Sequence, residues 1–402
     1  MTSGKSVLDK LESRHVPIKW SNVAAFRLSR HHLSNRVPPS ALTSAVADIV
    51  GAQAQVLLAA QMSIWARVKG AGLRDVDSAI WKDRSLVRAW AMRRTMFVLP
   101  AEELAMFVRG TTRRAAYGLR YALSRIGSKA ELDKLLDAVL EALREPRTRS
   151  DLAEILRKSL GYKLKTKAGG GWGNKRPVPW VEVGRASLPV GWLLHLIGAR
   201  DVICSGPGDG NEASYVRADS WISHWKDLSV AEAEKRLVVR YLEAFGPATL
   251  QDFALWAGMY VRDAKEIWSH VVDKLVPVNV EGWKANILRS DLSELKEASI
   301  EKPIARLLPY FDCFLLGHKS HSNIVDERNR KKIYRNQGWV SPVVLVNGQA
   351  EGVWSHVQKR DRLEITILPF NKLSPGICSR LKEEASDLGR FLECTSVNTK
   401  IG

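Results

Sequence analysis

Apolar residues recur at helical spacing in the middle of the chain, between Glu131 and Leu143. Pro146 closes this stretch. Thr148 follows, with Asp151 three positions later, which favours a new helix start because both side chains can bond to unpaired backbone N–H groups. The pattern therefore predicts two consecutive helices. The first has one buried stripe with spacing i, i+3, i+4, i+7, i+8 and i+11, formed by Leu132, Leu135, Leu136, Val139, Leu140 and Leu143.

The same pattern returns later in the chain. A second helical stripe ends at Gly246-Pro247, and Thr249 with Asp252 repeats the helix start. After each of these two helix starts the sequence predicts a further helix and a β-hairpin. A third copy of this arrangement is predicted upstream, nearer the N-terminus. Strand pairs are predicted over residues 87–92 and 95–99, 201–205 and 213–217, and 276–280 and 284–288. The helices of the first copy are predicted over residues 41–50, 56–68 and 76–86. Short helices followed by a hairpin are typical of the winged-helix plan, so we expect three such modules.

Beyond Pro303 the pattern changes to short β-rich runs around a turn at Asn347-Gly348, closed by a helix over residues 375–391. The predicted fold class is α+β, with three tandem winged-helix modules followed by a separate β-rich domain. The predicted boundaries are a tail over residues 1–19, modules over 20–130, 131–225 and 226–299, and a C-terminal domain over 300–402.

The net charge of the chain indicates which kinds of molecule it binds. The 402 residues are 45% hydrophobic, and 61 Lys and Arg against 43 Asp and Glu give a net charge of +18. Nucleic acid is the leading partner for such a chain; an anionic membrane is the alternative. We find neither a membrane span nor a basic amphipathic helix, and no signal peptide, so we expect a cytoplasmic, nucleoid-associated protein. The cysteines lack CxxC spacing and the histidines lack a ligand set, so we expect reduced, buried thiols and no metal.

Three stretches carry basic residues without an acid among them. For any single lysine, solvated surface is the ordinary interpretation. Acid-free stretches in three different modules favour a DNA footprint, because a duplex presents a continuous line of phosphates. If residues 105–130 are helical, positions 109, 113 and 120 share one face. The candidate DNA contacts from the three stretches are Arg109, Arg113 and Arg120; Lys165, Lys167, Lys175 and Arg176; and Arg328 and Lys331.

The candidate chemistry lies at Gly51-Ala52-Gln53-Ala54-Gln55, where two helices of the first module meet. Glutamines at i and i+2 point to different sides of a regular helix. They can serve one site only if the backbone between Gly51 and Gln55 is irregular, and Gly51 permits that. On spacing alone, ordinary capping or solvent-exposed amides remain the simpler interpretation.

Several motifs together resemble the AlkZ/YcaQ family of tandem winged-helix DNA glycosylases. They are the stretch from Gly51 to Val68 ending in Trp65-Ala66-Arg67, the wing from Val87 to Thr95, Leu307 to Asp312 running into Leu315-Leu316-Gly317, Asn336 to Gly348, and Gly352-Val353-Trp354. The resemblance implies a catalytic Q-apolar-Q motif at Gln53 and Gln55. It also implies a C-terminal barrel whose hairpin, within residues 318–338, approaches the minor groove. It adds Arg93, Arg94, His318 and Lys319 to the candidate DNA contacts. Arg94 stands where the family usually turns its wing with Gly.

The expected function is therefore a monomeric, monofunctional DNA glycosylase without metal or cofactor, acting on double-stranded DNA that contains alkylated bases. Alkylation at N7 of guanine or N3 of adenine makes the base cationic and a good leaving group, so a glutamine that aims water at the sugar is a sufficient catalyst. The resemblance extends the substrates to bulky adducts and interstrand crosslinks. The alternatives are a non-catalytic winged-helix regulator and a basic scaffold that binds RNA.

Overall fold

The computed structural model describes residues 15–167, 177–198, 200–208 and 212–402, in two compact units. The first unit contains the chain up to residue 79, residues 97–100 and residues 237–402. The second contains residues 80–96 and 101–236. The first predicted module is divided between them, and helix α12 (Val230–Phe245) contributes residues to both.

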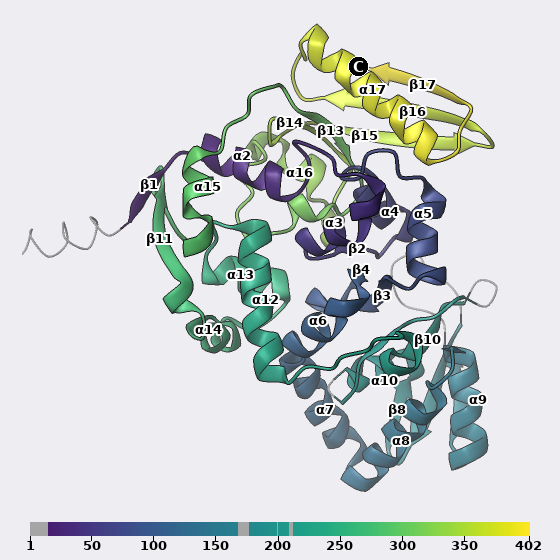
Figure 1. Cartoon of the computed structure of the whole chain (residues 1–402). Coiled ribbons are helices and arrows are strands. Elements are labelled where there is room, and N and C mark those ends of the chain that lie inside the picture. The colour runs from purple at the N-terminus through teal and green to yellow at the C-terminus, as the bar shows by residue number, and fades with distance from the viewer. Residues whose placement is uncertain (1–14, 168–176, 199, 209–211) are drawn as a thin grey trace, which may run out of the picture. The chain divides into compact units, whose positions relative to one another are not determined.

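The N-terminal part of the first unit follows the predicted order of helices closely (Figure 1). One difference is the helix predicted over residues 76–86. It starts earlier, because Asp75 accepts the N–H of Gly72, and it passes into a π-helical turn at Ser78–Lys82 before strand β3 (Leu86–Trp90). The other elements here are α2 (Trp20–Arg30), α3 (Leu42–Asp48), β2 (Ala52–Gln53), α4 (Leu57–Trp65) and α5 (Leu73–Asp77).

The predicted repeat is present as local structure. Thr148 and Thr249 each accept the N–H of an aspartate three residues on, and that aspartate accepts the threonine N–H in return. The second copy continues as α13 (Leu250–Ala257), α14 (Val261–Ser269) and the predicted hairpin of β11 (Leu275–Val280) with β12 (Trp283–Leu288). Strand β1 (Val16–Ile18) adds to β11 in parallel, and α15 (Leu292–Glu297) follows.

The C-terminal strands form an open sheet, so the expected barrel-like closure is wrong for the described residues. The order is β13-β14-β15-β16-β17, with β13 and β17 at opposite edges. Helix α17 (Pro375–Phe391), predicted with these bounds, packs along the sheet against β13 and β17 (Figure 1), and its Leu381, Ala385 and Leu388 are buried. The helix buries the sheet face that closure would otherwise have to cover. The strands are β13 (Ala305–Leu308), β14 (Val343–Val346), β15 (Gln349–Lys359), β16 (Arg362–Pro369) and β17 (Ser396–Ile401).

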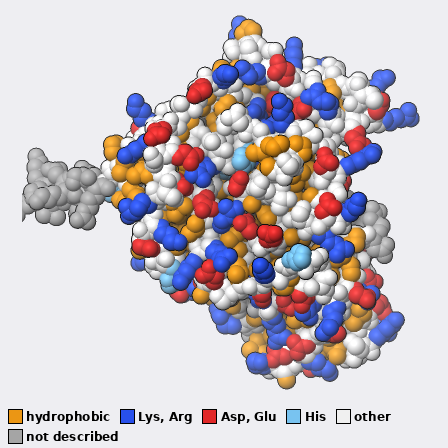
Figure 2. Space-filling view, in the orientation of Figure 1, with side chains coloured by type: hydrophobic (Ala, Val, Ile, Leu, Met, Phe, Trp, Pro, Cys, Tyr) orange, Lys and Arg blue, Asp and Glu red, His pale blue; other side chains and the backbone are white. Residues whose placement is uncertain are grey.

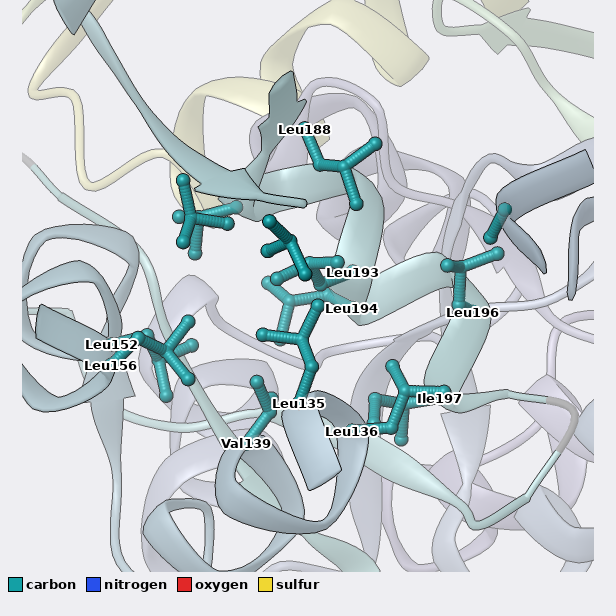
Figure 3. Packing of buried hydrophobic residues seen from close by; sticks show 14 of the residues in the cluster. Leu135, Leu136, Val139, Leu152, Leu156, Leu188, Leu193, Leu194, Leu196 and Ile197 are labelled. Carbon is teal, nitrogen blue, oxygen red and sulfur yellow. The ribbon is translucent and has the colours of Figure 1, made fainter. Parts of the chain in front are cut away.

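The second unit has its own core, built on the stripe predicted from residues 131–143. Figure 3 shows Leu135, Leu136 and Val139 of that stripe packed with residues of α9 and α10. Two small sheets have the orders β5-β10-β9 and β6-β7-β8. The helices are α6 (Leu104–Gly110), α7 (Arg113–Ile126), α8 (Lys129–Ala142), α9 (Arg149–Leu160), α10 (Val190–Ile197) and α11 (Ala218–Trp221). The strands are β5 (Arg147–Thr148), β6 (Lys163–Lys167), β7 (Val178–Val183), β8 (Ala186–Pro189), β9 (Ile203–Ser205) and β10 (Ser214–Arg217).

A buried ion pair joins distant parts of the first unit. Arg67, just after α4, donates to both carboxylate oxygens of Asp312 at 2.8 Å, and both side chains are fully buried. Ser63 donates to the same carboxylate at 2.8 Å, and so does the N–H of Phe314 at 3.0 Å. Burial alone would raise the pKa of Asp312, but Arg67 and these donors hold it below its usual value, so the pair stays charged.

Two histidines in the same unit are buried in neutral form. Arg27 donates to Nε2 of His318 at 2.7 Å, and since an arginine can only donate, this nitrogen accepts. Burial, followed by the charge of Arg27, lowers the pKa of His318 well below its usual value. Nε2 of His31 lies 3.1 Å from the Ala244 carbonyl oxygen, and the ring contacts Phe314 edge-on. Burial, followed by the charge of Arg67, lowers the pKa of His31 to about 3.

Removal of one partner of the buried pair should destabilise the protein strongly. Arg67→Ala leaves the Asp312 carboxylate buried without its counter-ion, at an expected cost of about 3–5 kcal/mol in the free energy of unfolding. The matched control is Arg74→Ala, whose pair with Glu393 is exposed and contributes about 0–1 kcal/mol. Urea unfolding of both variants measures the difference, and equal losses would contradict the interpretation.

Stability should also fall as pH is lowered from 6.5 toward 4. The unfolded chain binds protons at His31 and His318 near their ordinary pKa, whereas the folded chain does not, so acid favours unfolding. Each such histidine adds a slope of about 1.4 kcal/mol per pH unit in this window. His31→Phe removes one such proton and should reduce the slope of the unfolding free energy against pH by about 1.4 kcal/mol per pH unit. An unchanged slope in urea titrations at successive pH values would show that His31 titrates in the folded state.

Candidate active site and nucleic-acid interface

The backbone turns sharply just before the two candidate glutamines. Val50 and Gly51 have φ values of 51° and 91°, in the left-handed region. A Cβ atom at Gly51 would lie 2.4 Å from Cδ2 of Leu99 and 3.2 Å from the Val98 carbonyl oxygen. Only glycine satisfies both the φ value and the close approach of β4 (Met96–Pro100). The turn ends α3 and directs the chain into an extended segment.

Gln53 and Gln55 lie on this non-helical segment. Gln53 belongs to β2 and pairs with Phe97 of β4, and α4 does not begin until Leu57. The irregular backbone required between Gly51 and Gln55 is therefore confirmed. Within this segment only Ala52 and Gln53 form a strand, and Gln55 lies at a bend just before α4. Ala54 is fully buried, Gln53 is 8% exposed and Gln55 is exposed. The motif thus runs from the protein interior to the surface.

Helix α4 fixes the far end of this segment by contacts with the C-terminal region. Ser63 and Arg67 bond to Asp312, and the indole N–H of Trp65 donates to Asp387 of α17 at 3.0 Å. Trp65-Ala66-Arg67 and Leu307 to Asp312 are two of the motifs that carry the family resemblance, and here they meet. The ion pair of Arg67 with Asp312 was not predicted from the sequence. The signal that could have indicated it is an arginine in one motif and an aspartate in the other.

The turn between β3 and β4, predicted as a wing, is made by arginines where a glycine would be less strained. Arg93 and Arg94 have φ values of 54° and 58°, and the N–H groups of Arg94 and Thr95 bond back to the carbonyls of Ala91 and Met92. A left-handed residue other than glycine costs about 1–2 kcal/mol. Both side chains are half-buried, and burial lowers the pKa of Arg93 to about 10, which leaves it charged at neutral pH. The turn itself is therefore compatible with arginine at 94.

The predicted single basic face of residues 105–130 is wrong. Helix α6 ends at Gly110 and α7 begins at Arg113, so Arg109 and Arg113 lie on different helices. Arg109 donates to Asp227 at 2.7 Å and Arg113 to Glu234 at 2.5 Å, so both are neutralised by acids from far along the chain. Arg120 is exposed and stacks over the Tyr117 ring.

Some of the other residues predicted to contact DNA are exposed, and others are buried or paired within the protein. His318 is buried against Arg27 and cannot reach a DNA phosphate from there, so its predicted DNA contact is corrected to a structural role. Lys319 and Lys331 are exposed, while Arg328 is exposed but paired with Asp326. Lys165 pairs with Glu182, and Lys167 lies over the Trp180 ring. Lys175 and Arg176 lie outside the described residues.

A short hairpin lies beside these C-terminal cations. Tyr334 and Val340 form an antiparallel bridge, and the exposed tip Asn336–Gly338 includes Gln337 at a φ of 59°. It falls in the region where the resemblance predicts a groove-approaching hairpin. Tyr334 stacks on His321 with ring centres 3.9 Å apart, which holds the base of the hairpin. Helix α16 (Arg330–Ile333), with exposed Lys331 and Lys332, precedes it.

Charges of both signs are mixed on the molecular surface. Figure 2 shows Lys and Arg side chains interspersed with Asp and Glu over the face in view. Within the described ranges, no three or more His, Cys, Asp or Glu side chains gather as a metal site, and none of the described helices is long and apolar enough to span a membrane. All four cysteines are free. Cys204 and Cys313 are buried as predicted, but Cys378 and Cys394 are only half-buried.

Comparison with known proteins gives consistent matches along the chain. The sequence model of the family described as DNA glycosylase AlkZ-like matches residues 46–391. The interstrand DNA cross-link repair glycosylase of Streptomyces sahachiroi is 28% identical over 381 residues, which cover 92% of this chain and 96% of that protein. The solved structure of the S. sahachiroi DNA glycosylase AlkZ superposes with a TM-score of 0.77 at 25% identity, over 96% of this chain and all of that one.

Gly51→Ala should test the turn that places the glutamines. The variant adds left-handed strain and a clash with Leu99, so we expect it to lose about 2–4 kcal/mol of stability or to displace Gln53. The control is Gly70→Ala, where φ is 82° but no atom lies within 4 Å, so only the strain of about 1 kcal/mol applies. Urea unfolding compares the two. Equal losses would mean that the close approach to β4 is unimportant.

Proposed function

The chain belongs to the AlkZ-like DNA glycosylase family, and from this premise we propose that it is a monomeric, monofunctional glycosylase that releases cationic N-alkylated purines from duplex DNA. The observation that carries the proposal is the placement of Gln53 and Gln55. They lie on non-helical backbone after a glycine-dependent turn: Gln53 ends a short strand and is almost buried, and Gln55 lies at a bend and is exposed. This arrangement is compatible with one site shared by both amides.

The proposed reaction is attack of water on the sugar carbon that bears the base. N7-alkylguanine and N3-alkyladenine carry a positive charge, and the base leaves as a neutral purine when the glycosyl bond breaks, so no proton donor is needed. A glutamine carbonyl accepts a hydrogen bond from the water and aims its oxygen at the sugar. As the new C–O bond forms and the glycosyl bond breaks, the water loses a proton to bulk solvent. The amide dipole also favours the positive charge that develops there. An amide takes up no proton at neutral pH, so neutral lesions should react poorly.

The two glutamines should divide this work. Gln53 is 8% exposed and is flanked by the fully buried Ala52 and Ala54, so its dipole acts where water screens it little. Gln55 is exposed, and it can hold the incoming water at the open end of the motif. That open end also suits a lesion with a large substituent. We therefore extend the proposed substrates to bulky adducts and to interstrand crosslinks, the lesion named for the S. sahachiroi relative.

DNA would be held by winged-helix modules arranged in tandem. We assign phosphate contacts to the exposed cations Arg120, Lys319 and Lys331, and groove contacts to the wing arginines Arg93 and Arg94 and to the hairpin tip at residues 336–338. Phosphate contacts bind all sequences alike, which suits an enzyme that searches for damage and not for a base sequence. The ion-paired Arg109, Arg113 and Arg328 contribute less, because each already has a counter-ion.

Gln53→Ala and Gln55→Ala should each slow release of N7-alkylguanine from duplex DNA by about 10²–10³-fold, because loss of one positioned polar group commonly has that cost. DNA affinity should stay nearly unchanged, since a neutral amide adds little to phosphate binding. The control Gln251→Ala removes an exposed amide from α13 and should leave both quantities intact. Mass analysis of the released bases, with DNA binding in parallel, measures both.

Two further variants sharpen this test. The double variant should lose less than the sum of the single losses if both amides hold one water. Gln55→Asp should keep or raise activity, because a carboxylate stabilises the sugar cation and can accept the proton of water. If the wild-type protein binds DNA but releases no cationic base, the glycosylase proposal fails. A regulator that binds DNA without catalysis would then take its place.

A further inference from the structure

The chain between α9 and α10 forms a small sheet that the other repeat copy lacks. In the second unit, strands β6, β7 and β8 lie within residues 163–167 and 178–189, between these helices. The corresponding helices α13 and α14 are joined by residues 258–260 alone. The helix–helix–hairpin arrangement therefore forms without such a sheet, and its presence in one copy needs another reason.

The two faces of this sheet differ sharply in composition. Leu164, Val181 and Val183 alternate along β6 and β7 and pack into the core of the second unit. Leu188 of β8 is paired with Val181 and belongs to the same core, where Figure 3 shows it near Leu193. The opposite face carries the intervening residues of each strand, because side chains alternate across a sheet. These are Lys163, Lys165, Lys167, Val178, Trp180, Glu182, Ser187 and Pro189.

The lysines of this face form a regular row. Lys163, Lys165 and Lys167 are all exposed, and two residues of strand advance by about 6.6 Å. Each strand of DNA presents a regular line of phosphates, so a regular row of cations can meet several of them at once. The Nζ atom of Lys167 lies 3.9 Å from the centre of the Trp180 ring, which limits the freedom of this side chain. We call these three lysines with Trp180 and Glu182 the lysine face.

Glu182 is the one acid of the lysine face. It is paired in register with Lys163 and forms an ion pair with Lys165. The hydrogen bond from Lys165 lowers the pKa of Glu182, and the charges of Lys163 and Lys167 lower it further, so it is a carboxylate at neutral pH. A polyanion that approaches this face must displace Glu182 from Lys165. The carboxylate is therefore a built-in competitor for the same cation.

We propose that the lysine face binds the phosphate backbone of duplex DNA, and that Glu182 weakens this contact by occupying Lys165. The inference rests on the proposed function, because it takes DNA as the partner. It adds a contact surface formed by the inserted sheet, separate from the strand and turn that carry Gln53 and Gln55. It also assigns an acidic residue the role of limiting affinity for undamaged DNA, which favours release and renewed search.

The experiment measures binding of the full chain to an undamaged duplex over a range of salt concentrations. Lys163→Gln and Lys167→Gln should each weaken binding several-fold near 0.1 M salt and lower the slope of log K against log salt by about 0.9. Glu182→Gln should strengthen binding about two- to fivefold, because it frees Lys165 for a phosphate. The substituted side chains are exposed or half-buried, and circular dichroism verifies that each variant is folded.

The matched control is Glu154→Gln on α9 in the same unit. Glu154 is exposed and paired with Arg157 at 2.8 Å, so this variant changes the net charge equally without touching the lysine face. Equal effects of Glu154→Gln and Glu182→Gln would overturn the proposal, since only net charge would then matter. So would lysine variants that weaken binding to phosphatidylserine vesicles but not to DNA. Base release by the wild-type protein is measured separately, so failure of the glycosylase proposal is distinguishable from failure of this one.

Discussion

Arg67 and Asp312 form an ion pair from which water is excluded, and it joins helix α4 to the segment that follows β13. Two charges in such a place are stable only if both are well bonded. Ser63 and the N–H of Phe314 complete the shell of Asp312, and Arg67 donates also to the Ser63 carbonyl and the Cys313 sulfur, although its Nε has no hydrogen-bond partner. Helix α4 begins two residues after Gln55. The C-terminal region therefore fixes the helix that positions the candidate catalytic motif, although none of its residues belongs to that motif.

A second constraint acts on the other end of the motif. The left-handed turn at Val50 and Gly51 brings the backbone against Leu99 of β4, where only glycine fits. Between this turn and α4, five residues are free of helical geometry. The motif is thus held between a steric constraint before it and an electrostatic one after it. A site that uses two neutral amides gains from this, because weak dipoles assist a reaction only when they are well oriented.

The charge distribution shows how a strongly basic chain can present a mixed surface. Arg109, Arg113 and Lys165 come from stretches without acids, yet each pairs with a carboxylate brought close by folding. Such pairs remove cations from any DNA footprint without changing the net charge. The cations left exposed, such as Arg120 and Lys331, are fewer than the sequence suggests. Affinity for DNA then depends on where acids lie as much as on where lysines and arginines lie.

The sequence alone determined the features that depend on near neighbours. The two threonine–aspartate helix starts, the leucine stripe of residues 132–143 and the bounds of α17 followed from periodicity and capping, because these interactions act within a few residues. Gln53 and Gln55 could be selected, but their use in one site required an irregular backbone that spacing could not establish. Only the tertiary structure decided the open C-terminal sheet, the burial of His318 against Arg27 and the pairing of Arg67 with Asp312. The two side-chain contacts join residues 291 and 245 positions apart, and the sheet joins strands spread over residues 305–401, so their approach is set by packing of the whole unit and by no local pattern.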